Sequence, residues 1–205
     1  GIQPLRPTSR MILPLPTARG VLWTCPGIDS LMPALNPEDN VVLIGMPGVG
    51  KSTVGVLLAK VMSRDFIDTD VVIQARECRT LQDIIDQEGL ASFRLIEERH
   101  ILMSAYSGTV IATGGSVVYS GPAMEYLRER GVVVFLEVSI ERLKERLTNL
   151  AVRGVAMGAG QSIESLYEER MPLYRRFADV TVNCENLNHE QVVERVARVL
   201  EFPSA

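Results

Sequence analysis

The sequence predicts an α/β protein, a three-layer sandwich with helices on both faces of a parallel β-sheet. Short β-type runs alternate with helical stretches from residue 40 onward, which is the order of repeated β–α–β units. The first run, 41–44, is apolar throughout, as expected of a strand buried on both faces. A glycine-rich segment joins it directly to a helical stretch at 53–60. Together these features predict a single α/β layer sandwich.

Local signals mark the other elements in chain order. Thr80 is a good N-cap, Gly89 interrupts the helical pattern that follows it, Ser139 caps a later helix, and Asn188 with Gln191 suggests a capping box for the last one. The predicted strands are 41–44, 65–70, 109–113, 131–138 and 180–182. The predicted helices are 53–60, 81–87, 91–105, 122–130, 140–150, 162–178 and a final helix that ends at 200.

Composition narrows the class of protein. The chain has 205 residues, 46% of them hydrophobic and 22% charged, with a net charge of −4 and a pI near 5.3. These values are ordinary for a globular protein, and they argue against a nucleic-acid-binding surface. No apolar run is long enough to span a membrane. The three cysteines and two histidines lack metal-ligand spacing: Cys25, Cys78, Cys184, His100 and His189. We expect the cysteines to be structural or incidental and the histidines to be structural or solvent-facing. The cysteine pattern fits a reducing compartment, and we expect a cytoplasmic location.

The N-terminal segment differs in composition from the rest. Seven of the 11 prolines fall within residues 1–38, a density that predicts an extended or irregular segment. Residues 1–10 precede Met11, and we expect them to be an added segment upstream of the natural start. The α/β domain is therefore predicted to occupy residues 39–205.

A phosphate-binding pattern follows the first strand. It reads Gly45-x4-Gly50-Lys51-Ser52 and runs into a helix. Glycines at 45, 48 and 50 allow the backbone N–H groups to turn inward around an anion, and the N-terminus of the helix adds positive potential. Lys51 supplies a charge to the β- and γ-phosphates, and the Ser52 hydroxyl can ligate Mg²⁺. The pattern predicts a nucleoside triphosphate site.

Two carboxylates and two glycines follow neighbouring strands. Asp68 and Asp70 end the second predicted strand, and Gly114 and Gly115 follow the third. Ligands of parallel sheets bind beyond the carboxyl ends of the strands, where the phosphate loop also lies. One aspartate could hold Mg²⁺ through water while the other accepts or orients a hydroxyl proton. The alternative is a solvated strand end or a helix N-cap.

Three arginines are candidates for binding anionic groups. Arg94 precedes Glu97 by three residues, so the two form either a surface ion pair or a unit in which Glu97 holds Arg94 against a substrate carboxylate. Arg153 lies in a glycine-rich stretch and is either a lid residue or an ordinary loop arginine. For Arg170, on a predicted helix, the residues alone leave binding and structural roles open.

Taken together, these segments resemble the shikimate kinase family, over about residues 39–202. No segment after the phosphate loop is specific by itself, but their order and spacing are. The segments that carry the resemblance are Gly45–Ser52, Asp68-Thr69-Asp70, Phe93-Arg94-Leu95-Ile96-Glu97, Ala112-Thr113-Gly114-Gly115, Phe135-Leu136-Glu137-Val138 and Glu169-Arg170-Met171-Pro172-Leu173-Tyr174.

The resemblance implies a fold and an activity. The implied fold is that of nucleoside monophosphate kinases, with five parallel strands in the order 2-3-1-4-5. The implied activity uses ATP with Mg²⁺ and transfers phosphate to the 3-hydroxyl of shikimate, a step of aromatic amino acid biosynthesis. We expect a monomer that binds ATP and a small carboxylate-bearing alcohol, and neither nucleic acid nor membrane.

The resemblance also implies site residues, carried over position by position. The catalytic set is Lys51, Asp70 and Arg153, and the metal set is Ser52 and Asp68. The ATP-binding set is Gly48, Val49, Gly50, Lys51, Ser52, Thr53, Arg146 near the adenine, and Arg153 from a lid at about 151–163. The substrate-binding set is Asp70, Arg94, Gly114, Gly115 and Arg170, with both arginines on the substrate carboxylate.

The sequence departs from the family pattern near the acceptor. Ser116 stands where the family has a third glycine, Leu90 where it has a glutamate, and 153–156 reads Arg-Gly-Val-Ala where it has Arg-Pro-Leu-Leu. Another small hydroxy acid, such as homoserine or a sugar acid, is therefore an alternative acceptor. A GTPase switch is disfavoured because the Asn-Lys-x-Asp segment is missing, and a binding module without turnover because the catalytic residues are intact.

Overall fold

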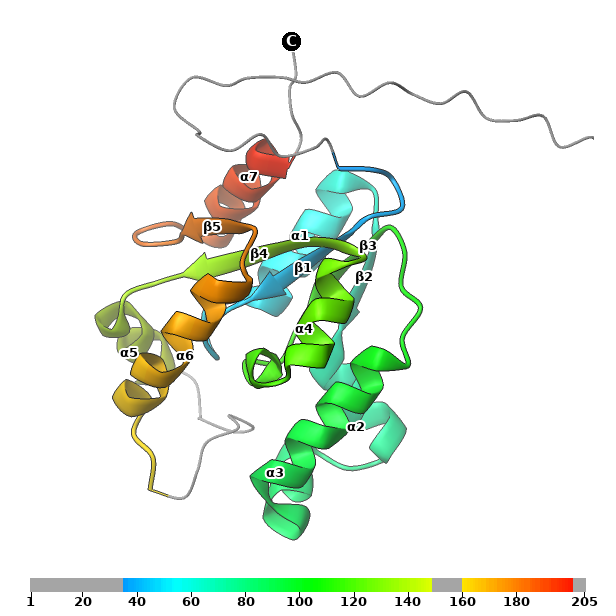
Figure 1. Ribbon diagram of the computed structural model, residues 1–205. Coiled ribbons are helices and arrows are strands. Elements are labelled where there is room, and N and C mark those ends of the chain that lie inside the picture. Colours follow the sequence, from blue (N-terminus) through cyan, green and yellow to red (C-terminus); the bar gives the residue numbers. More distant parts are fainter. Residues whose placement is uncertain (1–34, 149–159, 201–205) are drawn as a thin grey trace, which may run out of the picture. The chain divides into compact units, whose positions relative to one another are not determined.

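Five parallel strands form the central sheet, in the order β2-β3-β1-β4-β5 (Figure 1). The computed structural model describes residues 35–148 and 160–200. The middle strand is buried along its whole length, and its Val42 pairs with Ile111 of β3 on one side and Val133 of β4 on the other. The strands are β1 (Asn40–Ile44), β2 (Asp65–Asp68), β3 (Thr109–Ala112), β4 (Gly131–Glu137) and β5 (Val180–Asn183). The predicted three-layer fold and strand order are thus confirmed.

Helices cover both faces of this sheet (Figure 1). On one face α1 packs against α7, and on the other α4 and α6 contact β4. A single 3-10 turn, η1 (Val117–Tyr119), follows β3 and packs against α3, α4 and α6. The helices are α1 (Lys51–Met62), α2 (Thr69–Glu77), α3 (Leu81–Leu102), α4 (Gly121–Arg128), α5 (Ile140–Thr148), α6 (Ile163–Phe177) and α7 (His189–Leu200).

The strand predicted over 65–70 is wrong at its carboxyl end. β2 stops at Asp68, and Thr69 and Asp70 belong to the first turn of α2, a helix that was not predicted. The cause is an N-cap: Asp68 Oδ1 accepts hydrogen bonds from the backbone N–H groups of Asp70 at 3.0 Å and Val71 at 3.3 Å. Asp70 therefore projects from a helix rather than from a strand.

The predicted break at Gly89 is confirmed. Thr80 and Asp83 cap the first half of α3 in a capping box, and Gly89 then adopts φ 83° and ψ 165° before the helix resumes. This conformation is almost exclusive to glycine. The bend allows the second half of α3, which carries Arg94 and Glu97, to run in its own direction.

Replacing Gly89 with alanine is expected to lower the free energy of unfolding by about 1–3 kcal/mol, because the positive φ penalises a Cβ. Crowding is not the reason, since no atom lies within 4 Å of that position. Gly121→Ala is the matched control: it also faces open space but has no positive φ, and we expect a change within about 0.5 kcal/mol. Urea unfolding measures both, and equal effects would contradict the strain argument.

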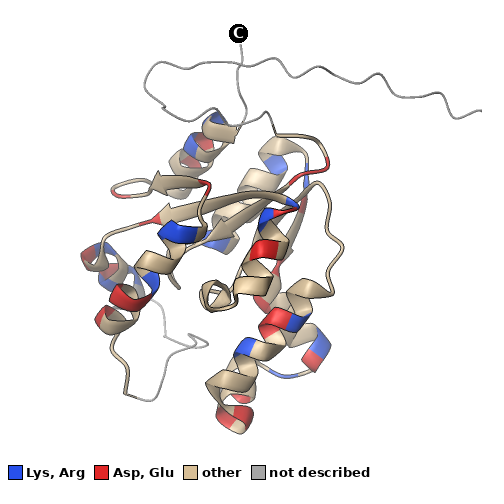
Figure 2. Ribbon diagram, in the orientation of Figure 1, with Lys and Arg blue, Asp and Glu red and all other residues tan. Residues whose placement is uncertain are grey.

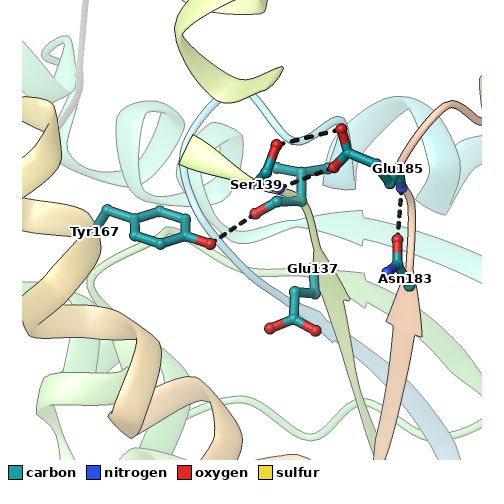
Figure 3. Close-up of a pocket in the computed structure, with 6 residues that line it drawn as sticks. Glu137, Ser139, Tyr167, Asn183 and Glu185 are labelled. Carbon is teal, nitrogen blue, oxygen red and sulfur yellow. Dashed lines mark hydrogen bonds between the residues drawn. The ribbon is translucent and has the colours of Figure 1, made fainter. Parts of the chain in front are cut away.

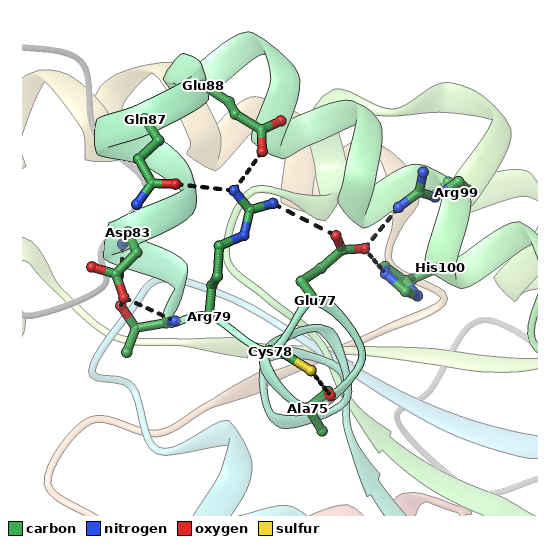
Figure 4. Close-up of polar contacts among 10 residues, drawn as sticks. Ala75, Glu77, Cys78, Arg79, Asp83, Gln87, Glu88, Arg99 and His100 are labelled. Carbon is green, nitrogen blue, oxygen red and sulfur yellow. Dashed lines mark hydrogen bonds and ion pairs between the residues drawn. The ribbon is translucent and has the colours of Figure 1, made fainter.

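Helices α2 and α3 share a small core of their own, separate from the main core around the sheet. It consists of Ile73, Leu81, Ile84, Phe93 and Ile96. At its edge the Glu77 carboxylate accepts hydrogen bonds from Arg99 at 2.7 Å and His100 at 2.8 Å, and Arg79 reaches Glu88 at 2.6 Å (Figure 4). These contacts tie the end of α2 to both halves of α3, so the two helices are held together as a unit.

Charges of both signs are interspersed along the helices (Figure 2). This mixture agrees with the small net charge of the chain, −4. Within the part of the chain that the structure describes, every helix is too short or too polar to cross a lipid bilayer.

Candidate active site

The phosphate loop between β1 and α1 has the backbone that its glycines predict. Gly45, Gly48 and Gly50 have φ of 146°, 81° and 103°, values that residues with a Cβ rarely adopt. A Cβ on Gly45 would also lie 2.7 Å from the Leu136 carbonyl oxygen of β4. Because Gly50 is the N-cap of α1, the free N–H groups of that helix open onto the loop. This arrangement attracts phosphate groups.

Lys51 reaches across the loop rather than into solvent. Its side chain is buried, and Nζ donates hydrogen bonds to the carbonyl oxygens of Gly45 at 2.8 Å and Met46 at 3.0 Å. Burial lowers the pKa of Lys51 to about 8, an effect that nearby Asp70 partly offsets. The ammonium is therefore held at the phosphate loop by the loop's own carbonyl groups. Ser52 and Thr53, next on α1, are exposed.

Asp70 lies close to this ammonium, in a confined environment. Its Oδ1 is fully enclosed and makes no hydrogen bond among the described residues. Burial, and to a smaller extent the neighbouring Asp68, raise the pKa of Asp70 to about 6, and Lys51 opposes the shift. A carboxylate with this pKa is ionised near neutral pH and basic enough to accept a proton.

A second carboxylate, Glu97, lies beside Asp70. A Cβ on Gly114 would overlap Glu97 Oε1 and lie 2.7 Å from Asp70 Oδ1, so both acids face the same bare glycine. Glu97 is 2% exposed and its Oε2 accepts a hydrogen bond from Ser116 Oγ at 2.7 Å. Burial raises its pKa to about 7 despite this hydrogen bond. Gly114 therefore has no room for a side chain, and Ser116 has a defined partner.

Two arginines reach the same region from different helices. Arg170 on α6 is completely buried, and a Cβ on Gly115 would lie 3.0 Å from its Nη1. Arg94 on α3 lies with its guanidinium 3.7 Å above the ring of Tyr119, and Arg170 Nε donates a hydrogen bond to the Tyr119 hydroxyl at 3.2 Å. The structure thus brings Arg170 to the glycine pair that the acids also approach, and Tyr119 contacts both Arg170 and Arg94.

The predicted Arg94–Glu97 pair does not form. Glu97 is buried rather than on the surface, and among the described residues it makes no ion pair with Arg94. Its partner is Ser116, while Arg94 stacks on Tyr119. The surface ion pair, one of the two alternatives, is therefore wrong, because Glu97 is buried. That Arg94 binds a substrate carboxylate stays a prediction.

Arg146 and His189 flank the phosphate loop. Arg146 Nη1 donates a hydrogen bond to the Val49 carbonyl oxygen at 2.9 Å. The ring of His189 is so close to the loop that a Cβ on Gly50 would lie 3.0 Å from its Nε2. His189 was expected to be structural or solvent-facing, and its lone position on the first turn of α7 gave no signal of this neighbour. Arg153 and most of the predicted lid lie outside the described residues.

The predicted metal set offers oxygen ligands only. Asp68 Oδ1 is engaged by backbone N–H groups, which leaves its other oxygen, and the Ser52 hydroxyl is exposed at the loop. Among the described residues there is no group of three or more His, Cys, Asp or Glu side chains that could hold a metal by itself. Such a donor set fits Mg²⁺, which keeps several waters and shares phosphate oxygens with one or two protein groups.

A separate pocket of about 340 Å³ lies beyond the carboxyl ends of β4 and β5 (Figure 3). Its polar groups bond to one another: Glu185 accepts hydrogen bonds from the Ser139 backbone and hydroxyl, and the Tyr167 hydroxyl donates to the Val138 carbonyl at 2.9 Å. The pocket contains none of the predicted site residues. The polar groups around Gly114 and Gly115 are therefore the better candidate for the reaction site.

Tyr119 is the site residue that sequence reasoning missed. It follows two valines in a segment that resembles a short strand, and nothing in that pattern indicates contact with two arginines. Tyr174, four residues after Arg170, is also part of the site wall, since its hydroxyl donates a hydrogen bond to the Gly115 carbonyl oxygen at 2.6 Å. Its spacing of one helical turn from Arg170 was the available signal.

Comparison with known proteins gives a consistent result. A family model described as "Shikimate kinase" matches residues 47–201. A shikimate kinase of Thiobacillus denitrificans is 40% identical over 169 residues, which cover 81% of this chain and 90% of that protein. A shikimate kinase of Haemophilus influenzae is 36% identical over 166 residues, covering 79% and 92%.

Solved structures agree with these relatives. The shikimate kinase from Acinetobacter baumannii in complex with shikimate has a TM-score of 0.71 and 28% identity, covering 80% of this chain and 93% of that chain. The shikimate kinase from Aquifex aeolicus has a TM-score of 0.65 and 31% identity, with coverage of 78% and 95%.

Proposed function

The chain belongs to the shikimate kinase family, and we propose that it phosphorylates shikimate itself, at the 3-hydroxyl, with ATP as phosphoryl donor. The observation that carries the proposal is the convergence on Gly114 and Gly115. Asp70, Glu97 and Arg170 approach this glycine pair from three helices, next to the phosphate loop and Lys51. A phosphate cradle, a proton acceptor and a cationic clamp in one place are what transfer to a carboxylate-bearing alcohol requires.

On this proposal the phosphate loop holds the nucleotide. The backbone of Gly48, Val49 and Gly50 and the N-terminus of α1 would bind its phosphates, and Lys51 would leave the Gly45 and Met46 carbonyls to contact them. Arg146, already fixed on the loop, would lie against the adenine, with Ser52 and Thr53 at the triphosphate. Arg153 remains a predicted lid residue, for closure over the phosphates.

At the acceptor side Asp70 would take the proton. With a pKa of about 6 it is ionised at neutral pH, so the acceptor hydroxyl can donate a hydrogen bond to its unpaired Oδ1. The proton would pass to this oxygen as the new O–P bond forms and the bond from the γ-phosphorus to ADP breaks. Arg94 and Arg170 would bind the acceptor carboxylate, and the bare backbone of Gly114 and Gly115 would allow the ring to approach closely.

Ser52 and the second oxygen of Asp68 would hold Mg²⁺. The ion would neutralise charge on the phosphates of the bound nucleotide. A monomeric state and a cytoplasmic location, both favoured by the sequence, complete the proposal; gel filtration and cell fractionation test them.

The decisive assay measures ADP release with shikimate and identifies the product by mass spectrometry. We expect turnover on the order of 1–100 s⁻¹, as is typical of kinases, and a product heavier by one phosphoryl group. Homoserine and gluconate serve as competing acceptors, and Lys51→Met controls for contaminating activity. Turnover with one of these acids but none with shikimate would remove shikimate from the proposal.

A further inference from the structure

Tyr119 joins the two arginines of the acceptor site. The two guanidinium groups come from α3 and α6, helices that both pack against η1, the turn that carries Tyr119. The guanidinium of Arg94 lies 3.7 Å above the centre of the ring, and that of Arg170 lies 5.2 Å from it. Tyr119 thus contacts an arginine from each of these two helices.

Each arginine uses a different part of the tyrosine. Arg94 uses the face of the ring, where the negative quadrupole attracts a cation. Arg170 uses the hydroxyl, to which its Nε donates a hydrogen bond at 3.2 Å. The Glu169 carboxylate lies near the same hydroxyl, and the interaction between them lowers the pKa of that acid. The phenol oxygen therefore accepts a hydrogen bond from one arginine while the ring face carries the other.

The contacts with Tyr119 also reduce the electrostatic repulsion between the two arginines. Two guanidinium groups side by side repel each other, and each carries several rotatable bonds whose ordering costs entropy. Arg94 contacts the ring face and Arg170 contacts the hydroxyl. These contacts reduce the repulsion and keep both guanidinium groups in fixed orientations. Arg94 Nε is fully enclosed and has no hydrogen-bond partner among the described residues, so stacking is what holds this group.

We propose that Tyr119 is a positioning residue for the acceptor: its ring and hydroxyl hold Arg94 and Arg170 in the one arrangement that receives a carboxylate. The inference rests on the proposed function, since it assigns the two arginines to the acceptor. It adds that Tyr119 sets acceptor affinity and the preference for a carboxylate without touching the transferred phosphoryl group.

The chain provides a matched control. Tyr126 on α4 carries the Arg130 guanidinium 3.7 Å above its ring, the same geometry at a place remote from the phosphate loop. Tyr119→Leu removes both the ring and the hydroxyl, Tyr119→Phe removes only the hydroxyl, and Tyr126→Leu makes the larger change at the control position. Tyr119→Phe preserves the packing volume, so it tests the proposal even if the leucine variant folds poorly.

Steady-state kinetics separate positioning from general damage. For Tyr119→Leu we expect the KM for shikimate to rise about tenfold, with the KM for ATP and kcat changed less than about twofold. For Tyr119→Phe the expected rise is about threefold, because the ring still holds Arg94. The preference for shikimate over methyl shikimate should fall by the same factors. Tyr126→Leu should leave all these values unchanged.

A measurement without turnover separates this inference from the proposed function. The Arg94 Nε–H resonance, displaced by the ring current of Tyr119, should move in Tyr119→Leu, and the variant should bind benzoate, a simple carboxylate probe, several-fold more weakly than the unaltered protein. Absence of shikimate turnover in the unaltered protein would overturn the proposed function only. An unmoved resonance with unchanged benzoate binding, or equal changes in both KM values and kcat, would overturn the role of Tyr119.

Discussion

Replacing Asp70 with asparagine is expected to lower kcat with shikimate by about 10²- to 10⁴-fold, the usual contribution of a positioned proton acceptor. The amide has nearly the same shape as the carboxylate, so the acceptor can still bind, but it cannot take the hydroxyl proton. The KM for ATP should change little, because the phosphate loop and Lys51 are intact. Stopped-flow or coupled ADP release measures both quantities.

The ionisation of Asp70 and Lys51 should also determine how kcat/KM for shikimate depends on pH. Burial raises the pKa of Asp70 to about 6, so kcat/KM for shikimate should fall as the pH drops below about 6 and the carboxylate becomes protonated. Burial lowers the pKa of Lys51 to about 8, so a second fall is expected above about pH 8, where the ammonium loses its charge. Saturating ATP should move this alkaline limb upward, because phosphates favour the charged amine.

Asp65→Asn is the matched control for this substitution. Asp65 is an exposed aspartate at the opposite end of β2 from Asp68, and its change to asparagine should leave kcat and the pH profile as they are. Unfolding is not expected to explain the loss in Asp70→Asn. The folded pKa of Asp70 is raised from 3.8 to about 6, so its ionisation lowers stability progressively over that pH range and the loss is complete above it. The asparagine variant should therefore be at least as stable at pH 8. A variant with normal turnover and an unchanged acid limb would exclude Asp70 as the proton acceptor.

The phosphate loop was predictable because its structure is encoded locally. Glycines at 45, 48 and 50 are required by backbone angles that other residues avoid, and the strand before them and the helix after them show in the apolar pattern. The break at Gly89 was predictable for the same reason. Strand order was not: it came from the resemblance to a family, since pairing between distant strands has no local signal.

The acceptor site was only partly predictable because its geometry depends on distant segments. The short apolar run that ends at Asp68 resembles a strand beyond its true end, and only the N-cap contacts show that Asp70 begins a helix. Arg94 stacks on Tyr119, which is 25 positions later in the chain, and Ser116 rather than Arg94 bonds Glu97. A residue departing from the family pattern, Ser116, thus takes part in the site through a contact that no spacing rule predicts.

Arg170 is the residue whose loss should affect acceptor binding most. It is completely buried next to Gly115, and truncating a buried charge that pairs with a ligand carboxylate commonly costs about 2–5 kcal/mol. We therefore expect Arg170→Met to raise the KM for shikimate by roughly 30-fold to more than 10³-fold. The KM for ATP should change far less, since the contacts of Arg170 are with the glycine pair and Tyr119.

Arg170→Lys distinguishes charge from shape. A lysine keeps the positive charge, but it has no planar fork to bind a carboxylate with two parallel hydrogen bonds while donating from Nε to Tyr119. We expect it to recover less than about a tenth of the loss. Arg175→Lys, on the exposed side of the same helix, changes only a surface ion pair with Glu137 and should be neutral. If Arg170→Lys restored full affinity, the site would need only a positive charge at this position and not the planar guanidinium group. Orientation of Arg170 by Tyr119 would then be unnecessary for acceptor binding.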